Sequence, residues 1–405
     1  MRLFPLLCGA ALALPTLTAT AKAETISAEI GASGLIATES RLAEMPAPTD
    51  ADRFALGGVR FLRSVEQALQ LRWQTGLSDQ LSMLPFLRLP IPENPSPLAF
   101  DPTAIATLFK SVSFGMDAAR APLSEIAPNA DFGVEISFKD IWFDINSNAT
   151  RDQGEDMLDV MGPMIMGWAW DERDPATPAP VIRFDGADAA WLSAYTHLLG
   201  GLSDMILAYD PTAPLTRITD ARTAMSKLGV ITPDPIFGMG GGASMDAVDY
   251  FAMILATLNQ TPDKARMLSA QTHLLAMVAD NRRFWADVAT ETDNDKEWIP
   301  KDGQTSAMGL DLPLGTGPMW LGVLSDVEAL LKGDKLIPFW RIDGPAGVDI
   351  AAMFTDPRAI DVAAWIQGEG AVPYLKQGIL ISPQSLTQFD AMMSGETMLF
   401  TLYLN

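Results

Sequence analysis

Cysteine is almost absent from this chain. Cys8 is the only one in 405 residues, and it lies in an N-terminal segment with the features of an export signal. Arg2 is the charged start, Leu3–Leu14 is a short apolar run, and Ala21-Lys22-Ala23 offers a cleavage site. We therefore predict a signal peptide over residues 1–23 and a periplasmic or secreted mature chain that has no disulfide and no disulfide-linked partner.

Basic residues are also scarce. The sequence has 28 Lys and Arg against 50 Asp and Glu, and loss of Arg2 and Lys22 with the signal would take the formal net charge from −22 to −24. Such a charge repels phosphate backbones, so we expect no nucleic-acid partner. After the signal no apolar run reaches the roughly 18 residues that a membrane span needs, so we expect no membrane-spanning segment. The partner itself is left unknown by the sequence.

Common catalytic motifs are missing as well. The patterns G-x-S-x-G, S-x-x-K and H-E-x-x-H do not occur, nor does the P-loop. The segment 238–243, Gly-Met-Gly-Gly-Gly-Ala, loosely matches a dinucleotide-binding loop. Because Thr232–Pro235 before it does not supply the strand that such a loop requires, we interpret it as a connector.

The chain is instead rich in the periodicity of amphipathic helices. Phe54–Trp73 places Val59, Leu62 and Leu69 on one apolar stripe, and a proline-rich connector follows at Leu89–Pro95. A second long helix is predicted from Thr261-Pro262-Asp263, with Thr261 as its cap, to about residue 290. Further helices are expected near 103–120, 187–208, 217–228, 244–258, 318–332 and 383–394.

Strand patterns are few. Val134–Phe138 alternates apolar and polar residues and runs on to Phe143, and shorter candidates are Val181–Phe184 and Met398–Tyr403. We predict a mainly α fold, a multi-helix globular body with a small antiparallel β element and one EF-hand-like loop, described next. After the signal, residues 24–405 are expected to form a single largely helical domain, or alternatively two lobes, 24–130 and 131–405.

The most informative segment is Asp144–Glu155, D-I-N-S-N-A-T-R-D-Q-G-E, which resembles an EF-hand calcium loop. Oxygen-bearing side chains occupy positions 1, 3, 5, 9 and 12 of its twelve residues. The resemblance implies side-chain ligation by three residues, a backbone carbonyl at the seventh position, a direct or water-mediated contact at the ninth and a bidentate carboxylate at the twelfth. The implied ligands are Asp144, Asn146, Asn148, Thr150, Asp152 and Glu155.

Two positions depart from the EF-hand pattern. The sixth normally holds Gly because the turn there needs a positive φ, and Ala149 at this position costs about 1 kcal/mol. The eighth normally holds a β-branched apolar residue, and here it is Arg151. We therefore expect one weak, unpaired Ca²⁺ site with a Kd on the order of 10⁻⁴ to 10⁻³ M. An ordinary acidic turn is the alternative interpretation.

Four acidic residues, Glu291, Asp293, Asp295 and Glu297, follow the second long helix directly and precede Trp298. They are candidates for a second cation site or for a pair of carboxylates in acid/base catalysis. A solvated helix end is the simpler explanation of an acidic run.

The only histidines, His197 and His273, lie in an internal echo. Leu192–Leu199 followed by Asp204 resembles Leu268–Leu275 followed by Asp280, although two copies are weak support for a repeat and chance explains them equally well. Within one helix a His and an Asp seven residues later stand roughly 10 Å apart, too far to share an ion. A site built from both helices and a pair of satisfied core or interface histidines are the two interpretations.

Several short segments resemble a group of exported bacterial proteins of no assigned activity. They are Lys335–Arg341, Trp365–Gly368, Pro373–Leu375, Phe184-Asp185 and Ala190–Leu192. The resemblance covers most of the mature chain, implies export and transfers no catalytic residue.

Taken together, these features predict an exported calcium-binding or calcium-stabilised protein with a binding or structural role. Its loop would lock the strand ending at Phe143 against a helix beginning near Asp156. The alternative is a secreted or periplasmic carboxylate-dependent hydrolase acting on a glycan, using residues such as Asp293, Asp295 or Glu297. Such an enzyme should bring two carboxylates together in a concave pocket beside some of the ten tryptophans, which otherwise belong to the core.

Overall fold

The computed structural model describes residues 25–76, 89–99, 101–128, 130–166, 170, 172–174, 176–229, 243–309, 312–382 and 387. Several predictions fall outside these residues. They concern the signal peptide 1–23, the glycine-rich connector 238–242, nearly all of the helix 383–394 and the strand Met398–Tyr403.

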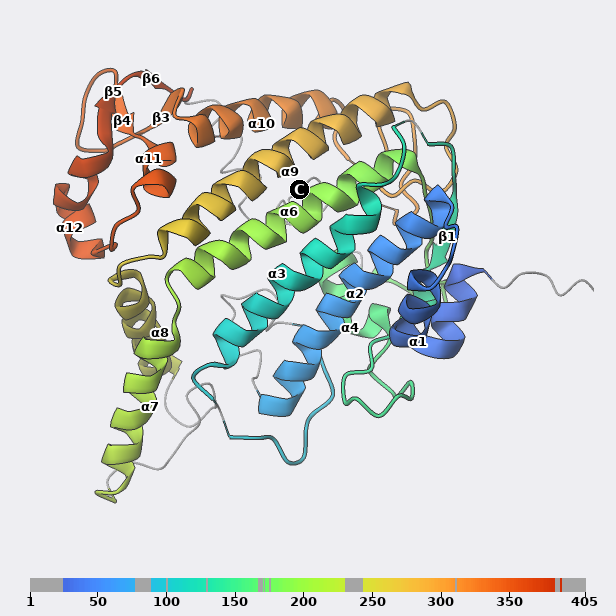
Figure 1. The fold of residues 1–405 in the computed structure, drawn as a ribbon, viewed down its shortest axis with the longest axis horizontal. Helices are drawn as coiled ribbons and strands as arrows, with labels where there is room; N and C mark the ends of the chain where they lie inside the picture. Colours follow the sequence, from blue (N-terminus) through green and yellow to red (C-terminus); the bar gives the residue numbers. More distant parts are fainter. Residues whose placement is uncertain are drawn as a thin grey trace, which may run out of the picture.

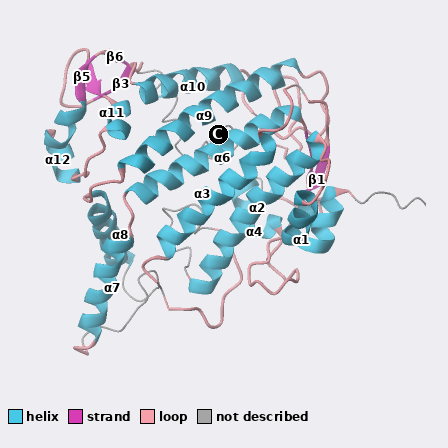
Figure 2. Cartoon of the chain, viewed as in Figure 1, coloured by secondary structure: helices cyan, strands magenta, loops and turns pink. Residues whose placement is uncertain are grey.

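Long helices lying side by side form the body of the molecule (Figure 1). In spatial order they are α1 (Ile26–Ala43), α2 (Asp50–Thr75), α3 (Ala104–Leu123), α6 (Gly186–Ala208), α9 (Lys264–Thr290) and α10 (Thr316–Lys332). The mainly α class is confirmed (Figure 2). In the described part of the chain no helix is long and apolar enough to span a membrane.

Shorter helices flank this array. Figure 1 shows α7 (Thr212–Ser226) and α8 (Ala243–Leu258) as an arm at the lower left. Around them and the main helices are α4 (Met157–Met166), α11 (Ile350–Thr355), α12 (Val362–Gln367) and the 3₁₀ helix η3 (Glu369–Tyr374). The helices predicted near 217–228 and 244–258 are thus present, the first beginning five residues earlier than expected.

The two predicted long helices start by different means. Thr49 caps α2 in a reciprocal capping box with Asp52, and Gly76 in the left-handed conformation ends it. The prediction that Thr261 caps α9 was wrong. Asp263 is the cap, and its carboxylate accepts the backbone N–H groups of Ala265 and Arg266, so Pro262 lies before the helix and not in its first turn.

Within the described ranges, two small sheets accompany the helices. β1 (Val134–Ser137) pairs antiparallel with β2 (Val181–Phe184), which confirms the predicted antiparallel element. The predicted continuation of β1 to Phe143 is interrupted by the 3₁₀ helix η2 (Phe138–Asp140). A second sheet, of order β5-β4-β3-β6, was not predicted, and its strands are β3 (Lys335–Pro338), β4 (Ala346–Val348), β5 (Leu375–Gln377) and β6 (Ile379–Leu380).

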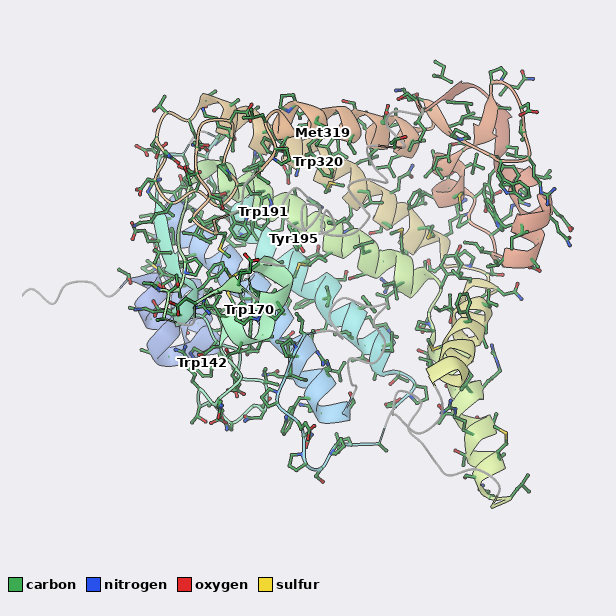
Figure 3. All side chains as sticks on the ribbon, turned by 180° about the vertical axis from the view of Figure 1, so that it is seen from behind. Trp142, Trp170, Trp191, Tyr195, Met319 and Trp320 are labelled. Atoms are coloured by element: carbon green, nitrogen blue, oxygen red, sulfur yellow. The ribbon has the colours of Figure 1, made fainter. Side chains whose placement is uncertain are left out.

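The tryptophans mostly belong to the core. Trp142, Trp191, Trp298 and Trp320 are all buried, with exposed fractions below a tenth, and Figure 3 shows Trp142, Trp191 and Trp320 distributed along the body of the molecule. Trp340 is the clear exception, because it is exposed and Arg341 stacks on its ring. Most of the described tryptophans are therefore part of the core.

α6 and α9 cross as an antiparallel pair with the two histidines at the middle. The Nδ1 atoms of His197 and His273 share a hydrogen bond of 2.9 Å. On one side Ser193 donates to Asp280 over 2.5 Å, and on the other Arg266 donates to Asp204 over 2.7 Å. The two similar segments thus run antiparallel to each other. Each histidine has the other as its hydrogen-bond partner across the helix interface.

The histidine pair is held neutral by its surroundings. Burial lowers the pKa of His197 to about 3, and the nearby charge of Arg120 and the neighbouring His273 add to the effect. Burial and Arg120 also lower the pKa of His273, against the opposing charges of Asp117 and Asp204. At neutral pH the two imidazole rings are therefore joined by one N–H···N hydrogen bond.

A cavity of about 170 Å³ interrupts the main core. Its nineteen lining residues come from α1, α2, β1, η2, α4, β2, α6 and the segment around Trp298. Seven of these residues are only half-buried, so the cavity is a pocket that reaches towards the surface and not an enclosed void.

Candidate metal centre

The predicted calcium loop closes between η2 and α4. The backbone N–H of Phe143 donates to the carbonyl of Glu155, and that of Met157 donates to the carbonyl of Ile141. Trp142 and Asp156 pair as an antiparallel bridge between these two bonds. The ends of the loop are therefore joined by a short ladder, and residues 144–155 form a ring attached to it.

Asp144, the first loop residue, has its carboxylate inside the ring. The side chain is buried, and its two oxygens accept the backbone N–H groups of Asn148 at 2.9 Å and Ala149 at 3.0 Å. A carboxylate held by two amides across the ring stays in one orientation. Its place in the loop is that of the first ligand in an EF-hand loop.

Glu155, the last loop residue, is fully buried. One carboxylate oxygen accepts the N–H of Ile145 at 3.0 Å and that of Asn146 at 3.4 Å, and the other accepts the N–H of Asp152 at 2.9 Å. Burial raises the pKa of Glu155, and these N–H donors act in the opposite direction. The carboxylate therefore bridges the two ends of the loop, accepting from Ile145 and Asn146 near its start and from Asp152 near its end. Burial disfavours its ionised form.

The backbone takes the positive φ that the sixth position was expected to need. Ala149 has φ +62°, and Ser147 two residues earlier has φ +60°. Neither residue is glycine, so each adopts a conformation that a Cβ disfavours. The ring is thus closed by two strained residues that are fixed by the hydrogen bonds around Asp144.

The two asparagines present both ends of their amides to the loop. Their oxygens accept backbone N–H groups two residues on, from Asn148 to Asn146 and from Thr150 to Asn148. Their Nδ2 groups both donate to one oxygen of Asp152, at 2.8 and 2.7 Å, which lowers the pKa of that carboxyl. A cation ligated by all six predicted residues would require both amides to turn an oxygen towards it.

Arg151, the unusual eighth residue, is directed to the flanks of the loop. Its Nε donates to Asp156 and its Nη2 to the carbonyl of Lys139, each over 2.6 Å. The positive charge is therefore paired outside the set of candidate ligands, and it ties the loop to η2 and to the residue before α4.

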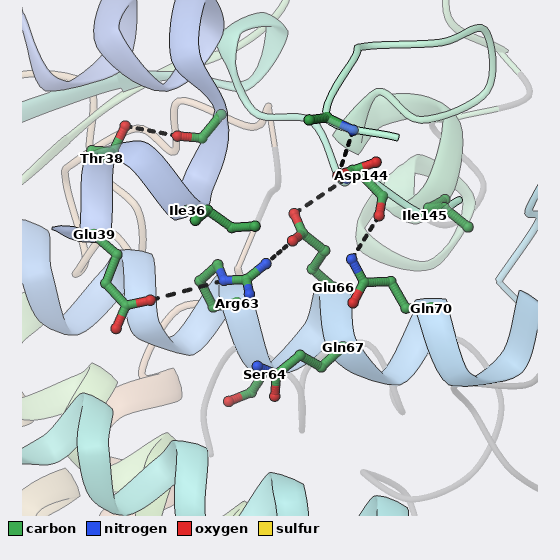
Figure 4. Close-up of polar contacts among 12 residues, drawn as sticks. Ile36, Thr38, Glu39, Arg63, Ser64, Glu66, Gln67, Gln70, Asp144 and Ile145 are labelled. Atoms are coloured by element: carbon green, nitrogen blue, oxygen red, sulfur yellow. Dashed lines mark hydrogen bonds and ion pairs between the residues drawn. The ribbon is translucent and has the colours of Figure 1, made fainter. Parts of the chain in front are cut away.

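α2 supports the loop from below through residues that the sequence analysis missed (Figure 4). Glu66, 1% exposed, accepts the N–H of Asp144 at 3.2 Å, and Gln70 donates to the carbonyl of the same residue at 2.7 Å. Arg63 pairs with Glu66 and reaches Glu39 on α1 at 3.8 Å. A signal was available, since Glu66 falls on the apolar stripe of α2, where a charge needs a buried partner.

The donor set of the loop is made of oxygen atoms only. That is the chemistry that Ca²⁺ prefers, and softer metals prefer nitrogen and sulfur. Across the described ranges there is no group of three or more His, Cys, Asp or Glu side chains placed to hold a metal ion. In the loop, amide and carbonyl oxygens would therefore have to supply half of the set beside the three carboxylates.

The second acidic cluster is divided by exposure. The side chains of Asp293 and Asp295 are half exposed and lie 3.7 and 3.8 Å from Arg183. Glu297 is buried, and its carboxylate accepts the backbone N–H of Asp295 at 2.8 Å. Glu291 accepts a hydrogen bond from Gln304, and its burial raises its pKa to about 7. The cluster thus combines a solvated segment with two partly dehydrated carboxyls.

A cavity with both polar and apolar lining residues lies beside this cluster. It has a volume of about 400 Å³ and is bounded by the end of α9, residues 300–305 and the start of α10. Trp285, Lys301 and Gln304 line it, and the buried indole N–H of Trp285 has no hydrogen-bond partner among the described residues. Gln304 is the residue that connects Glu291 to this cavity.

The chain has no counterpart in the comparisons with known proteins. No family model matches it, and no curated protein or solved structure is significantly similar to it.

Proposed function

We propose that this is an exported calcium-binding protein in which one Ca²⁺ is held by Asp144, Asn146, Asn148, Thr150, Asp152 and Glu155. The observation that supports this proposal best is the burial of Asp144 and Glu155, whose carboxylates approach the same ring from its two ends. The charge of Asp152 acts unfavourably on Glu155, and a divalent cation bound by the loop carboxylates would offset such repulsion.

The role of the ion is structural. The short ladder at the base of the loop joins the segment Ile141–Phe143 to the start of α4, and a cation that draws the two ends of the loop together strengthens that junction. Metal binding is then coupled to folding. With a Kd near 10⁻³ M, 10 mM calcium would add about 1.4 kcal/mol to the free energy of unfolding.

Calorimetric titration of calcium into the chelator-treated mature protein tests the proposal. We expect one site in the wild type, none in an Asp144→Ala, Glu155→Ala double variant, and a calcium-dependent rise in melting temperature in the wild type alone. Asp159→Ala, which removes an exposed carboxylate of α4 just beyond the loop, is the matched control and should bind as the wild type does. Absence of heat and of a thermal shift at several millimolar calcium contradicts the proposal.

The hydrolase alternative has one observation in its favour. Glu291, with a pKa of about 7, lies next to a cavity that also contains a buried tryptophan with an unused N–H. A carboxyl with that pKa serves as a general acid at neutral pH. A panel of glycans assayed with wild type and Glu291→Gln decides the matter, since this alternative requires a turnover that the variant loses.

A further inference from the structure

The core cavity has a wall without charge. Among the described residues that line it there is no Asp, Glu, Lys, Arg or His. Most of the lining side chains are buried by the fold itself, including Val59, Ile136 and Trp191. An ionised ligand would lose its hydration there without gaining a partner, so the cavity favours neutral, apolar molecules.

Aromatic rings make up much of that wall and touch one another in a chain. Phe54 lies 5.5 Å from Phe184, Phe184 lies 6.1 Å from Trp298, and Trp298 meets Trp191 edge to face at 5.5 Å between ring centroids. Trp191 in turn stacks on Tyr195, and Figure 3 shows these two side chains next to each other on α6. Ring edges and faces arranged in this way are the partners that a further aromatic ring prefers.

The volume sets the size of the guest. At about 170 Å³ the cavity is slightly larger than an engineered apolar cavity of about 150 Å³ that stays dry and binds benzene. It accommodates one six-membered ring with a small substituent, whereas two fused rings would fill most of it and leave little freedom to orient. Water is a poor occupant, because it needs two to four polar partners.

Part of the wall is adaptable. Met157 and Met161 of α4 contribute unbranched side chains that adjust to a guest. Gly58 of α2 also lines the cavity, and a Cβ placed there would meet nothing within 4 Å. Gly58, Phe61, Leu62 and Met161 are only half-buried, so this part of the cavity lies close to the protein surface.

We propose that this cavity is a binding site for a neutral, single-ring aromatic molecule. None of the proposed calcium ligands lines this cavity, and the proposal does not rest on the calcium proposal. The ring would sit among Phe54, Phe184 and Trp191 on the aromatic part of the wall and would contact Val59 and Ile136 on the aliphatic part.

Toluene is the probe, with benzoate as its charged counterpart and naphthalene as the oversized one. By calorimetry and thermal unfolding of the full mature chain we expect saturable toluene binding and a rise in Tm of about 1–2 °C at tenfold excess over Kd. Benzoate should give neither effect, and naphthalene should bind at least tenfold more weakly. Binding of hexane in preference to toluene, or equal binding of benzoate, would overturn the proposal.

Ala55→Leu is the variant that fills the cavity. Ala55 is a buried lining residue of α2, and the larger side chain should abolish toluene binding. Ala28→Leu, the same change at an exposed position of α1, is the matched control and should bind toluene as the wild type does. A folded Ala55→Leu variant that retains wild-type affinity contradicts the placement of the ligand.

A direct measurement covers the case in which Ala55→Leu does not fold. Wild-type crystals exposed to bromobenzene should show one anomalous bromine peak inside the cavity, near Val59, Ile136 and Trp191. Bromine found only elsewhere, or nowhere at saturation, refutes the site.

Discussion

The calcium loop and the aromatic cavity share a wall but are built in opposite ways. Ile141 and Met157 line the cavity and also form the hydrogen bond that closes the base of the loop. The loop is made of consecutive, mostly polar residues that hydrogen-bond to one another. The cavity is made of apolar side chains that lie as far apart in the sequence as Ile26 and Trp298. A local site can therefore be recognised from its spacing, whereas a dispersed site requires the fold.

The largest effect should come from removing the support below the loop. Glu66→Gln leaves Arg63 without its buried partner and weakens the contact to Asp144, and we expect a loss of about 3 kcal/mol in the free energy of unfolding. Chemical denaturation measures it. Gln67→Ala, on the exposed face next to it, is the control and should change stability by less than about 0.5 kcal/mol.

The same variant also tests whether loop and cavity are independent. Calcium affinity should fall in Glu66→Gln, because Asp144 loses its fixed position. Toluene binding should persist, because no cavity residue is changed. Parallel loss of both ligands would show that the shared wall couples the two sites.

Adjacent glycines of α2 provide the next contrast. A Cβ on Gly57 would lie 2.6 Å from Leu123 and 3.1 Å from the carbonyl of Ala119, whereas a Cβ on Gly58 meets nothing. Gly57→Ala should therefore lower stability by about 1–3 kcal/mol through overpacking. Gly58→Ala should raise it by about 0.5–1 kcal/mol, because alanine favours the helix. Equal effects in thermal or chemical unfolding would contradict this account of the α2 surface.

On the loop side, Ala149→Gly should relieve strain. The positive φ of this residue disfavours alanine, so glycine is expected to add about 1 kcal/mol to stability and to raise calcium affinity by up to about fivefold. Ala149→Val should do the reverse. Unfolding curves measure the stability and calorimetry the calcium affinity. A destabilised glycine variant would show that the backbone of Ala149 is not strained.

The smallest effect concerns pH and the histidine pair. Both histidines have a folded pKa below the ordinary value, so below about pH 6.5 the unfolded chain binds more protons and stability falls as the pH decreases. Each histidine contributes at most about 1.4 kcal/mol per pH unit, and less because both are partly exposed.

The His197→Gln, His273→Gln double variant should have a flatter stability profile between pH 6.5 and 4 than the wild type. The difference between the two profiles is the quantity to measure, because Asp188 and Glu291 have raised pKa values and act with the opposite sign. If stability falls with pH equally steeply in the variant and the wild type, the histidines do not contribute to the pH dependence.

The sequence predicted the elements whose pattern repeats. α2 and α9 span more than seven turns each, so their apolar residues recur at helical spacing often enough to be distinguished from chance. The strands of the second sheet have two to four residues, too few for an alternation to be visible. The spacing of oxygen-bearing residues over twelve positions identified the candidate loop. The roles of Gln70 and Arg63 below it could not be predicted, because their contacts depend on where the fold places the loop. The cavity could not be predicted from the sequence, because the residues that line it are of the same apolar types as those of the close-packed core.

The crossing of α6 and α9 brings two similar segments of one chain into contact. These segments of similar sequence run antiparallel here, and the contact of His197 with His273 has the geometry found at the centre of an isologous contact. The flanking bonds are not symmetric, because Asp280 accepts from Ser193 and Asp204 accepts from Arg266. In separate chains the same histidine contact would suit a symmetric homodimer. Here both halves belong to one polypeptide, so the association is intramolecular and does not weaken on dilution.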